Sequence, residues 1–226
     1  MEIRAYTLAL EVTRRCNMCC EHCLRGEAQA VDMQRETIDM VLDAVDGIEN
    51  VLFTGGEPSL NLPLINYFFE EAEKRGKLPS SFSLITNGKE NQLDLAMLYL
   101  KWFPQMDDKE YCYLAQSQDP FHDEVSTTPL SALNSFTFHK IDPKYVLNEG
   151  RAADNGLGMV EKEPLHIYFD NIDDDSCSLE MLYINASGEV VFDCDLSYET
   201  QHKVSPCHIE DLRDYIEKAV ESGVSA

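Results

Sequence analysis

Short apolar runs alternate with helical patterns along most of this chain, and the alternation limits the folds that it can adopt. The strand-like runs are 6–12, 51–53, 81–85, 111–117, 136–141 and 166–169, and the helical patterns lie at about 37–45, 62–75 and 92–100. Strands and helices in alternation predict βα units around a mostly parallel sheet. At roughly 25 to 30 residues for each unit, scaled from about 250 for eight, six units use most of the first 170 residues. We therefore expect an α/β fold, a partial (β/α)6 TIM-like barrel of parallel strands.

The alternation breaks at the acidic stretch 170–175. Beyond it, residues 182–192 have the pattern of a β-hairpin, and 209–220 that of an amphipathic helix. These features predict a barrel domain over residues 1–170 and a small C-terminal hairpin-helix extension over residues 171–226. The acidic stretch lacks the glycine and the terminal glutamate of an EF-hand calcium loop, so we interpret it as a solvated loop.

The charge of the chain excludes some classes of partner. Lys and Arg number 18 against 41 Asp and Glu, a net charge of −23. Such a surface repels phosphate backbones and anionic lipid, so we expect neither nucleic acid nor a membrane surface as a partner. No stretch has the length and apolar character of a transmembrane helix or a signal peptide, which favours a cytoplasmic protein. Because cytosolic thiols stay reduced, the eight cysteines are expected to bind metal or react.

Four cysteines fall within eight residues, shortly after the first strand-like run. Cys16, Cys20 and Cys23 have the spacing C-x3-C-x2-C, with which one short loop can ligate three of the four irons of a cubane cluster. The alternative is zinc, because Cys16 with Cys19 and Cys20 with Cys23 each have a zinc-knuckle spacing and His22 is near. A structural zinc usually draws its ligand pairs from two separated loops. A zinc-binding interaction module without catalytic activity is thus the alternative function, and it belongs to a different class from an enzyme.

The motif CNMCCEHC at 16–23, followed by GGEP at 55–58 after the second strand, resembles the radical SAM superfamily. The resemblance implies a 4Fe–4S cluster on Cys16, Cys20 and Cys23, with Cys19 a bystander, and S-adenosylmethionine on the open iron. It also implies reductive cleavage to a 5′-deoxyadenosyl radical, which abstracts hydrogen from a substrate not identified by the sequence. An electron donor such as flavodoxin or ferredoxin is the further partner implied.

The GGEP segment is the first candidate for binding S-adenosylmethionine. Two glycines allow the backbone to approach a ligand closely, and the carboxyl end of a barrel strand is the catalytic rim. The resemblance implies that Gly55, Gly56, Glu57 and Pro58 bind the amino group of the methionine moiety, with Glu57 as an acceptor. An ordinary turn between strand and helix is the alternative for this segment taken alone. Asn87 ends the third strand at the same rim.

Two further segments resemble radical SAM motifs. Ser117 and Asp119 form a Ser-x-Asp sequence followed by His122, which implies that Ser117 reaches the carboxylate or ribose of S-adenosylmethionine. We expect Asp119 and His122 to contact substrate or to supply acid-base catalysis, with a structural turn as the alternative. Arg151 lies in a Gly-Arg-Ala sequence, and its guanidinium suits a carboxylate of S-adenosylmethionine or substrate. Solvated surface is the alternative for this arginine.

The C-terminal cysteines resemble the start of the Twitch and SPASM extensions, in which a hairpin presents ligands to an auxiliary iron–sulfur cluster. Ten residues, a glycine and five residues separate Cys177 from Cys194, and Cys207 follows. The family has four residues after the glycine, and a later block of cysteines is absent here. Buried apolar positions, or zinc with His202 or His208, are the alternatives. This resemblance favours a peptide or protein substrate. A small-molecule rearrangement of the 7-carboxy-7-deazaguanine synthase kind and activation of a glycyl-radical enzyme stay open.

Overall fold

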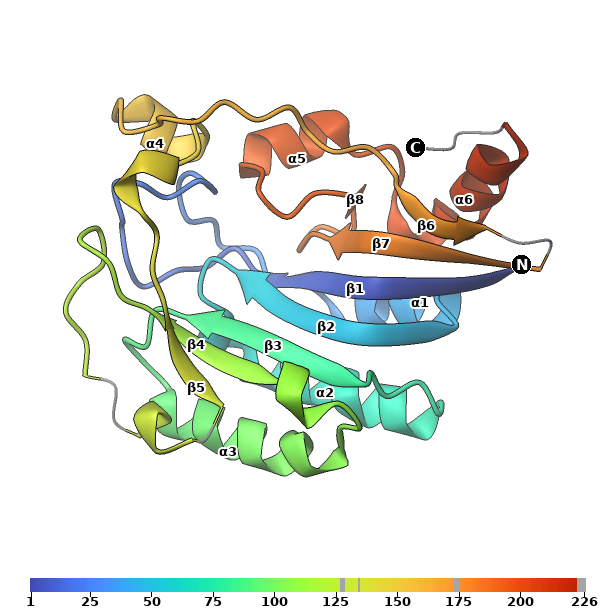
Figure 1. The fold of residues 1–226 in the computed structure, drawn as a ribbon, viewed down its shortest axis with the longest axis horizontal. Helices are drawn as coiled ribbons and strands as arrows, with labels where there is room; N and C mark the ends of the chain where they lie inside the picture. The colour runs from blue at the N-terminus through green and yellow to red at the C-terminus, as the bar shows by residue number, and fades with distance from the viewer. Residues whose placement is uncertain (127–128, 134, 173–174, 223–226) are drawn as a thin grey trace.

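The computed structural model describes residues 1–126, 129–133, 135–172 and 175–222, which fold around one sheet (Figure 1). Its strands are β1 (Glu2–Thr13), β2 (Gly47–Gly55), β3 (Ser81–Thr86), β4 (Tyr113–Ser117), β5 (Phe136–His139), β6 (Phe169–Ile172), β7 (Ser176–Ile184) and β8 (Val190–Val191). The α-helices are α1 (Arg35–Ala44), α2 (Leu62–Lys74), α3 (Gln92–Trp102), α4 (Gly150–Asp154), α5 (Tyr198–Val204) and α6 (Leu212–Glu221). Short 3-10 helices are Pro58–Asn61, Phe103–Gln105, Lys109–Tyr111, Leu130–Ala132, Pro143–Tyr145 and Ile209–Asp211.

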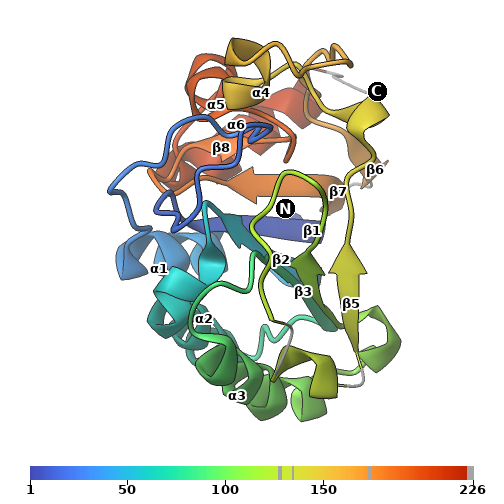
Figure 2. The same cartoon turned by 90° about the vertical axis from the view of Figure 1, so that its left-hand side faces the viewer.

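The sheet confirms the predicted partial barrel. Its order is β5-β4-β3-β2-β1-β7-β6, and the neighbours from β5 to β7 are parallel. The sheet is not closed, since β5 and β6 are its edges. Helices α1, α2 and α3 cover its outer face (Figures 1 and 2). The first five predicted strands and the three predicted helices are present with small shifts at their ends.

The sixth parallel strand corrects the prediction. It is β7, which pairs with β1 from Glu2 to Leu10, whereas the predicted run 166–169 contributes only the start of β6. Strand β6 is antiparallel to β7. Exposed and buried residues alternate from His166 to Asp170, and Asn171 and Ile172 are exposed, as in an edge strand with one wet face. A parallel barrel strand needs both faces covered.

Strand β1 lies inside the sheet, between β2 and β7, and every residue from Leu8 to Thr13 is buried. Leu8 and Leu10 join the main core between the sheet and its helices, and Ala9 joins a smaller cluster on the opposite face with Tyr183 and Val191. Side chains of a strand alternate between the two faces, so both faces of β1 are covered. The carboxyl end of this interior strand therefore brings the cysteine-rich loop to the carboxyl-end edge of the sheet.

The C-terminal segment continues the same sheet and the same main core. The predicted hairpin is present, because Tyr183 pairs with Val191 and Ile184 with Val190. The predicted final helix is α6, and α5 is an addition that the sequence did not indicate. The division into two domains near residue 170 stays a prediction, and residues 173–174 of the acidic stretch lie outside the described residues. Among the described helices, none has the length and apolar character to cross a membrane.

Candidate functional site

The clustered cysteines lie in the loop between β1 and α1, at the carboxyl ends of the parallel strands. A cavity of about 510 Å³, hereafter the central cavity, opens over these strand ends. Its walls include all the residues predicted to bind the cluster or S-adenosylmethionine, namely Cys16, Cys20, Cys23, Gly55, Gly56, Glu57, Pro58, Asn87, Ser117 and Arg151. A second cavity of about 650 Å³, the outer cavity, borders the other side of the loop. The volume of the central cavity is in the range of small-molecule sites.

The four thiols of the loop differ in their surroundings. Cys16, Cys20 and Cys23 are half-buried and line the central cavity, whereas Cys19 is exposed and lines only the outer cavity. Burial and then the neighbouring Cys23 and Cys16 raise the pKa of Cys20 to about 11. Mutually repelling thiolates of this kind become stable when a metal centre takes their charge. The donor set fits a four-iron cluster with one open corner, and the ligand assignment itself stays a prediction.

The two glycines of GGEP approach the backbone of the chain itself. A Cβ at Gly55 would lie 2.2 Å from the carbonyl oxygen of Thr13, and one at Gly56 would lie 2.3 Å from that of Arg15. The N–H of Gly56 donates to the Thr13 carbonyl (2.8 Å), and the next N–H along donates to the Arg15 carbonyl (2.8 Å). The backbone that comes close to these glycines is therefore the segment that leads into the cysteine loop. Both glycines also line the central cavity.

Glu57 fastens two strand ends together. Its carboxylate is 1% exposed and accepts hydrogen bonds from Oγ1 of Thr86 (2.6 Å), the N–H of Asn87 (2.7 Å) and one N–H of its own turn. Burial raises the pKa of Glu57, and these hydrogen bonds oppose the rise. The side chain of Asn87 donates to Oδ1 of Asn17 (2.8 Å) and lies 3.8 Å from Sγ of Cys16. Glu57 thus positions Asn87 against the cysteine loop, with three donors from the chain already on its carboxylate.

The loop after β4 meets the cysteine loop through aromatic rings. The ring of His22 stacks on Phe121 at 4.5 Å and meets His122 edge-on at 5.0 Å. Asp119 accepts from the N–H of Phe121 (2.9 Å) and lies 2.9 Å from Nδ1 of His122. Burial lowers the pKa of His22. Burial also opposes ionisation of Asp119, but the hydrogen bonds from His122 and from the N–H of Phe121, together with the charges of the two histidines, outweigh it, so the pKa of Asp119 is lowered. Sequence reasoning named His22 only as a zinc alternative and missed its contact with Asp119 and His122.

Arg151 is buried against the cysteine loop. Its N–H donates to the carbonyl of Cys23 (2.9 Å), and its Nη1 lies 2.7 Å from Sγ of Cys19. A Cβ at Gly150 would lie 2.4 Å from the carbonyl oxygen of Leu24, so the Gly-Arg pair needs its glycine for this close packing. The side chain lines both cavities and is 8% exposed, which excludes the solvated position considered for it.

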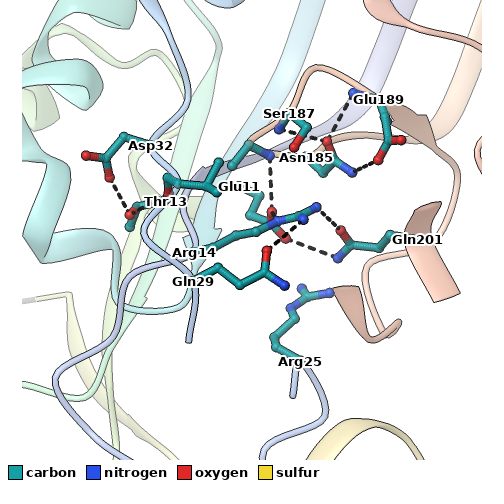
Figure 3. Close-up of polar contacts among 12 residues, drawn as sticks. Glu11, Thr13, Arg14, Arg25, Gln29, Asp32, Asn185, Ser187, Glu189 and Gln201 are labelled. Atoms are coloured by element: carbon teal, nitrogen blue, oxygen red, sulfur yellow. Dashed lines mark hydrogen bonds and ion pairs between the residues drawn. The ribbon is translucent and has the colours of Figure 1, made fainter. Parts of the chain in front are cut away.

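A buried polar network anchors the segment before Cys16 (Figure 3). Glu11 of β1 is fully buried and accepts from Nε of Arg14 (2.7 Å), from the hydroxyl of Tyr183 (2.7 Å) and from Nε2 of Gln201 (3.1 Å). The same Gln201 accepts from Nη2 of Arg14 at 3.2 Å. The network therefore ties β1 to β7 and α5 of the C-terminal extension. A glutamate inside an otherwise apolar strand was the sequence signal that could have indicated it.

The segment after Cys23 is anchored to the same extension. Arg25 is buried, its Nη1 donates to the carbonyl of Leu196 (2.6 Å), and its guanidinium lies 5.2 Å from the centre of the Tyr183 ring. The N–H of Tyr198 donates to the carbonyl of Arg25 at 3.1 Å. Both flanks of the cysteine loop are consequently held by the C-terminal extension.

The C-terminal cysteines do not share one place. Cys177 is buried in the main core near the start of β7, and Cys194 lines the central cavity. The carbonyl of Cys207 accepts from the N–H of Val190, which pairs with Ile184 at the far end of β7. Seven residues at about 3.3 Å each put that end roughly 23 Å along the strand from Cys177. The structure does not bring Cys177 and Cys207 together as ligands of one auxiliary cluster.

Comparison with known proteins gives one family match. Residues 10–102 match the family model described as the Radical SAM superfamily. An uncharacterized protein of Methanocaldococcus jannaschii is 39% identical over 61 residues, which are 26% of this chain. The matched segment spans 21% of the length of that curated relative.

Two solved structures align with this chain over most of its length. BtrN in complex with AdoMet and 2-DOIA aligns with a TM-score of 0.56 and 14% identity, over 99% of this chain and 89% of that chain. Native anSMEcpe with bound AdoMet and Cp18Cys peptide aligns with a TM-score of 0.46 and 13% identity, over 95% of this chain and 79% of that chain. The similarity to the first structure supports the partial-barrel fold.

Proposed function

Because residues 10–102 match the family model of the radical SAM superfamily, whose enzymes use a 4Fe–4S cluster and S-adenosylmethionine, we propose that this chain is such an enzyme and that Cys16, Cys20 and Cys23 ligate its cluster. The observation that carries the assignment is that these three thiols face one cavity, while Cys19 is turned outward to Arg151. When bound, the cluster supplies the electron that cleaves S-adenosylmethionine, and the 5′-deoxyadenosyl radical so formed abstracts hydrogen from a substrate. An electron donor such as flavodoxin or ferredoxin belongs to the same proposal.

The same cavity supplies groups for binding S-adenosylmethionine. The carboxylate of Glu57 already accepts from three donors, so we assign the amino group to the backbone carbonyls of Gly55 and Gly56, which line the same cavity. Nε of Arg151 is buried without a partner among the described residues, and a guanidinium suits the methionine carboxylate. The Ser117 hydroxyl at the end of β4 is available for the ribose or the carboxylate.

The substrate would occupy the part of the cavity that the proposed cluster and S-adenosylmethionine leave free. Segment 145–147 and the pair Cys194 and Asp195 line the same cavity and are available to contact it. The peptide substrate predicted from the C-terminal cysteines loses part of its basis, because the structure does not gather those cysteines. A small-molecule substrate is the second candidate, and a cavity of about 510 Å³ favours it.

The test is an anaerobic assay of the reconstituted protein. With dithionite and S-adenosylmethionine, we expect about four irons for each chain and slow formation of 5′-deoxyadenosine, measured by mass spectrometry. The Cys20→Ala variant is expected to make none, and Cys19→Ala is the matched control that retains product formation. A fully loaded cluster that yields no 5′-deoxyadenosine would contradict the proposal.

A further inference from the structure

We propose that His22, Asp119 and His122 form a second metal site, for one Zn²⁺ ion, next to the three cysteines of the proposed cluster and without using them as ligands. The cysteine loop provides His22, and the loop after β4 provides the other two residues. One ligand atom from each of the three lies within 4.8 Å of the others. No cysteine takes part, so the site does not depend on the proposed iron–sulfur cluster.

Two buried polar atoms at this place have no partner. Among the described residues, Nδ1 of His22 and Oδ2 of Asp119 make no hydrogen bond. The side chain of Asp119 is 1% exposed and His22 is 6% exposed, so solvent reaches neither well. Buried polar groups nearly always have a hydrogen-bond partner or a ligand. Two atoms without a partner on neighbouring residues indicate a ligand that accepts an electron pair from each of them. A metal ion between them does this, whereas an acid-base role of His122 with Asp119 leaves His22 unexplained.

The surroundings hold the ligands in place before any metal binds. The ring of His22 is fixed by stacking on Phe121, with an angle of 22° between the ring planes. Asp119 and His122 are fixed by their mutual contact at 2.9 Å and by the bond from the Phe121 N–H to Asp119. Prepositioned ligands lose little freedom on binding, which favours affinity.

The donor set and its surroundings indicate what the metal would do. Two imidazoles and one carboxylate are the ligands of zinc sites that keep an open position for water or substrate. His22 and His122 line the central cavity, and Asp119 and His122 line a neighbouring cavity of about 400 Å³. The open position would therefore face the substrate. A zinc ion there would polarise an oxygen of the substrate as a Lewis acid and hold it next to the site of hydrogen abstraction.

Metal analysis of the intact protein tests the proposal. After anaerobic purification, incubation with Zn²⁺ and removal of the excess, we expect about one zinc for each chain in addition to the cluster iron. Asp119→Asn and His122→Ala should lose this zinc and keep their iron. His139→Ala is the matched control, because His139 also lines the central cavity but lies outside the group. Its zinc content is expected to equal that of the unchanged protein.

Further variants separate this site from the cysteines. The triple variant Cys16→Ala, Cys20→Ala and Cys23→Ala is expected to lose its iron and retain zinc, so failure of the cluster proposal leaves this one intact. Zinc that disappears with the three cysteines, or that persists in both Asp119→Asn and His122→Ala, would overturn the proposal. A wild-type protein that takes up no zinc would overturn it without any variant. Circular dichroism identifies any variant that has not folded. For such a variant, the zinc content of the wild-type protein decides the test.

Discussion

The substitution Gly56→Ala tests whether GGEP holds the cysteine loop in place. The added Cβ would lie 2.3 Å from the carbonyl oxygen of Arg15 and 2.9 Å from that of Arg14, where ordinary contact begins at 3.4 Å. The obstacle is backbone and cannot rotate away. The chain just before Cys16 must therefore move by about 1 Å, which displaces the first predicted cluster ligand.

The expected size of the effect follows from this clash. Overpacking of a tightly packed site costs about 1–3 kcal/mol. For a chain of this length, a loss of 1 kcal/mol lowers the melting temperature by about 2–4 °C, so a fall of roughly 2–12 °C is expected. The occupancy of the cluster should fall as well, because the Cys16 thiol no longer meets the geometry set by the other two.

The assay compares Gly56→Ala with Gly47→Ala, at the start of β2, the strand that Gly56 directly follows. A Cβ at Gly47 would meet only the flexible side chain of Arg4, at 3.4 Å, so this control is expected to stay within about 0.5 kcal/mol of the unchanged protein. Iron and acid-labile sulfide are measured together with thermal unfolding. A Gly56→Ala protein with full iron and an unchanged melting temperature would refute the assigned role of the close approach.

Three other predictions concern the loop, its anchor and the extension. Cys20→Ala should abolish the cluster absorbance while Cys19→Ala keeps most of it, and the opposite result would show that the register is wrong. Glu11→Gln leaves Arg14 buried without its counter-charge and should cost about 3–5 kcal/mol in urea unfolding; Glu2→Gln, which breaks an exposed pair on the same strand, should cost less than about 1 kcal/mol. Burial opposes ionisation of Asp193, but the hydrogen bonds from Lys162 and from the N–H groups of Asp195 and Leu165, together with the charge of Lys162, outweigh it, so the pKa of Asp193 is lowered. The stability that Asp193 provides is therefore full above its ordinary pKa of 3.8 and is lost as the pH falls below it, so the gap in melting temperature between the unchanged protein and Asp193→Asn should shrink on acidification.

Apolar periodicity in the sequence predicted those strands and helices whose formation depends on residues close together in the chain. The strand before the cysteine loop and the helices α1 to α3 follow from apolar periodicity, and the cysteine spacing located the candidate site. The position of β7 beside β1 could not be predicted in this way. The position depends on which of two segments pairs with the free edge of β1. Both segments, 166–169 and 176–184, have enough apolar residues to form a strand.

The contacts around the site are also long-range. Glu11 meets Tyr183 and Gln201, which lie 172 and 190 residues away in the chain. The glycines of GGEP were predicted to be close to a ligand, yet the nearest atoms belong to Thr13 and Arg15. A motif shows where glycine is required, and only the folded structure shows which backbone comes close.

The central claim is that the loop holds a four-iron cluster with one iron open to S-adenosylmethionine. Electron paramagnetic resonance of the dithionite-reduced protein, with and without S-adenosylmethionine, tests it most directly. The account predicts the signal of a reduced 4Fe–4S cluster, absent in Cys20→Ala, that changes when S-adenosylmethionine binds at the open iron. A cluster signal that stays the same at saturating S-adenosylmethionine would contradict the claim.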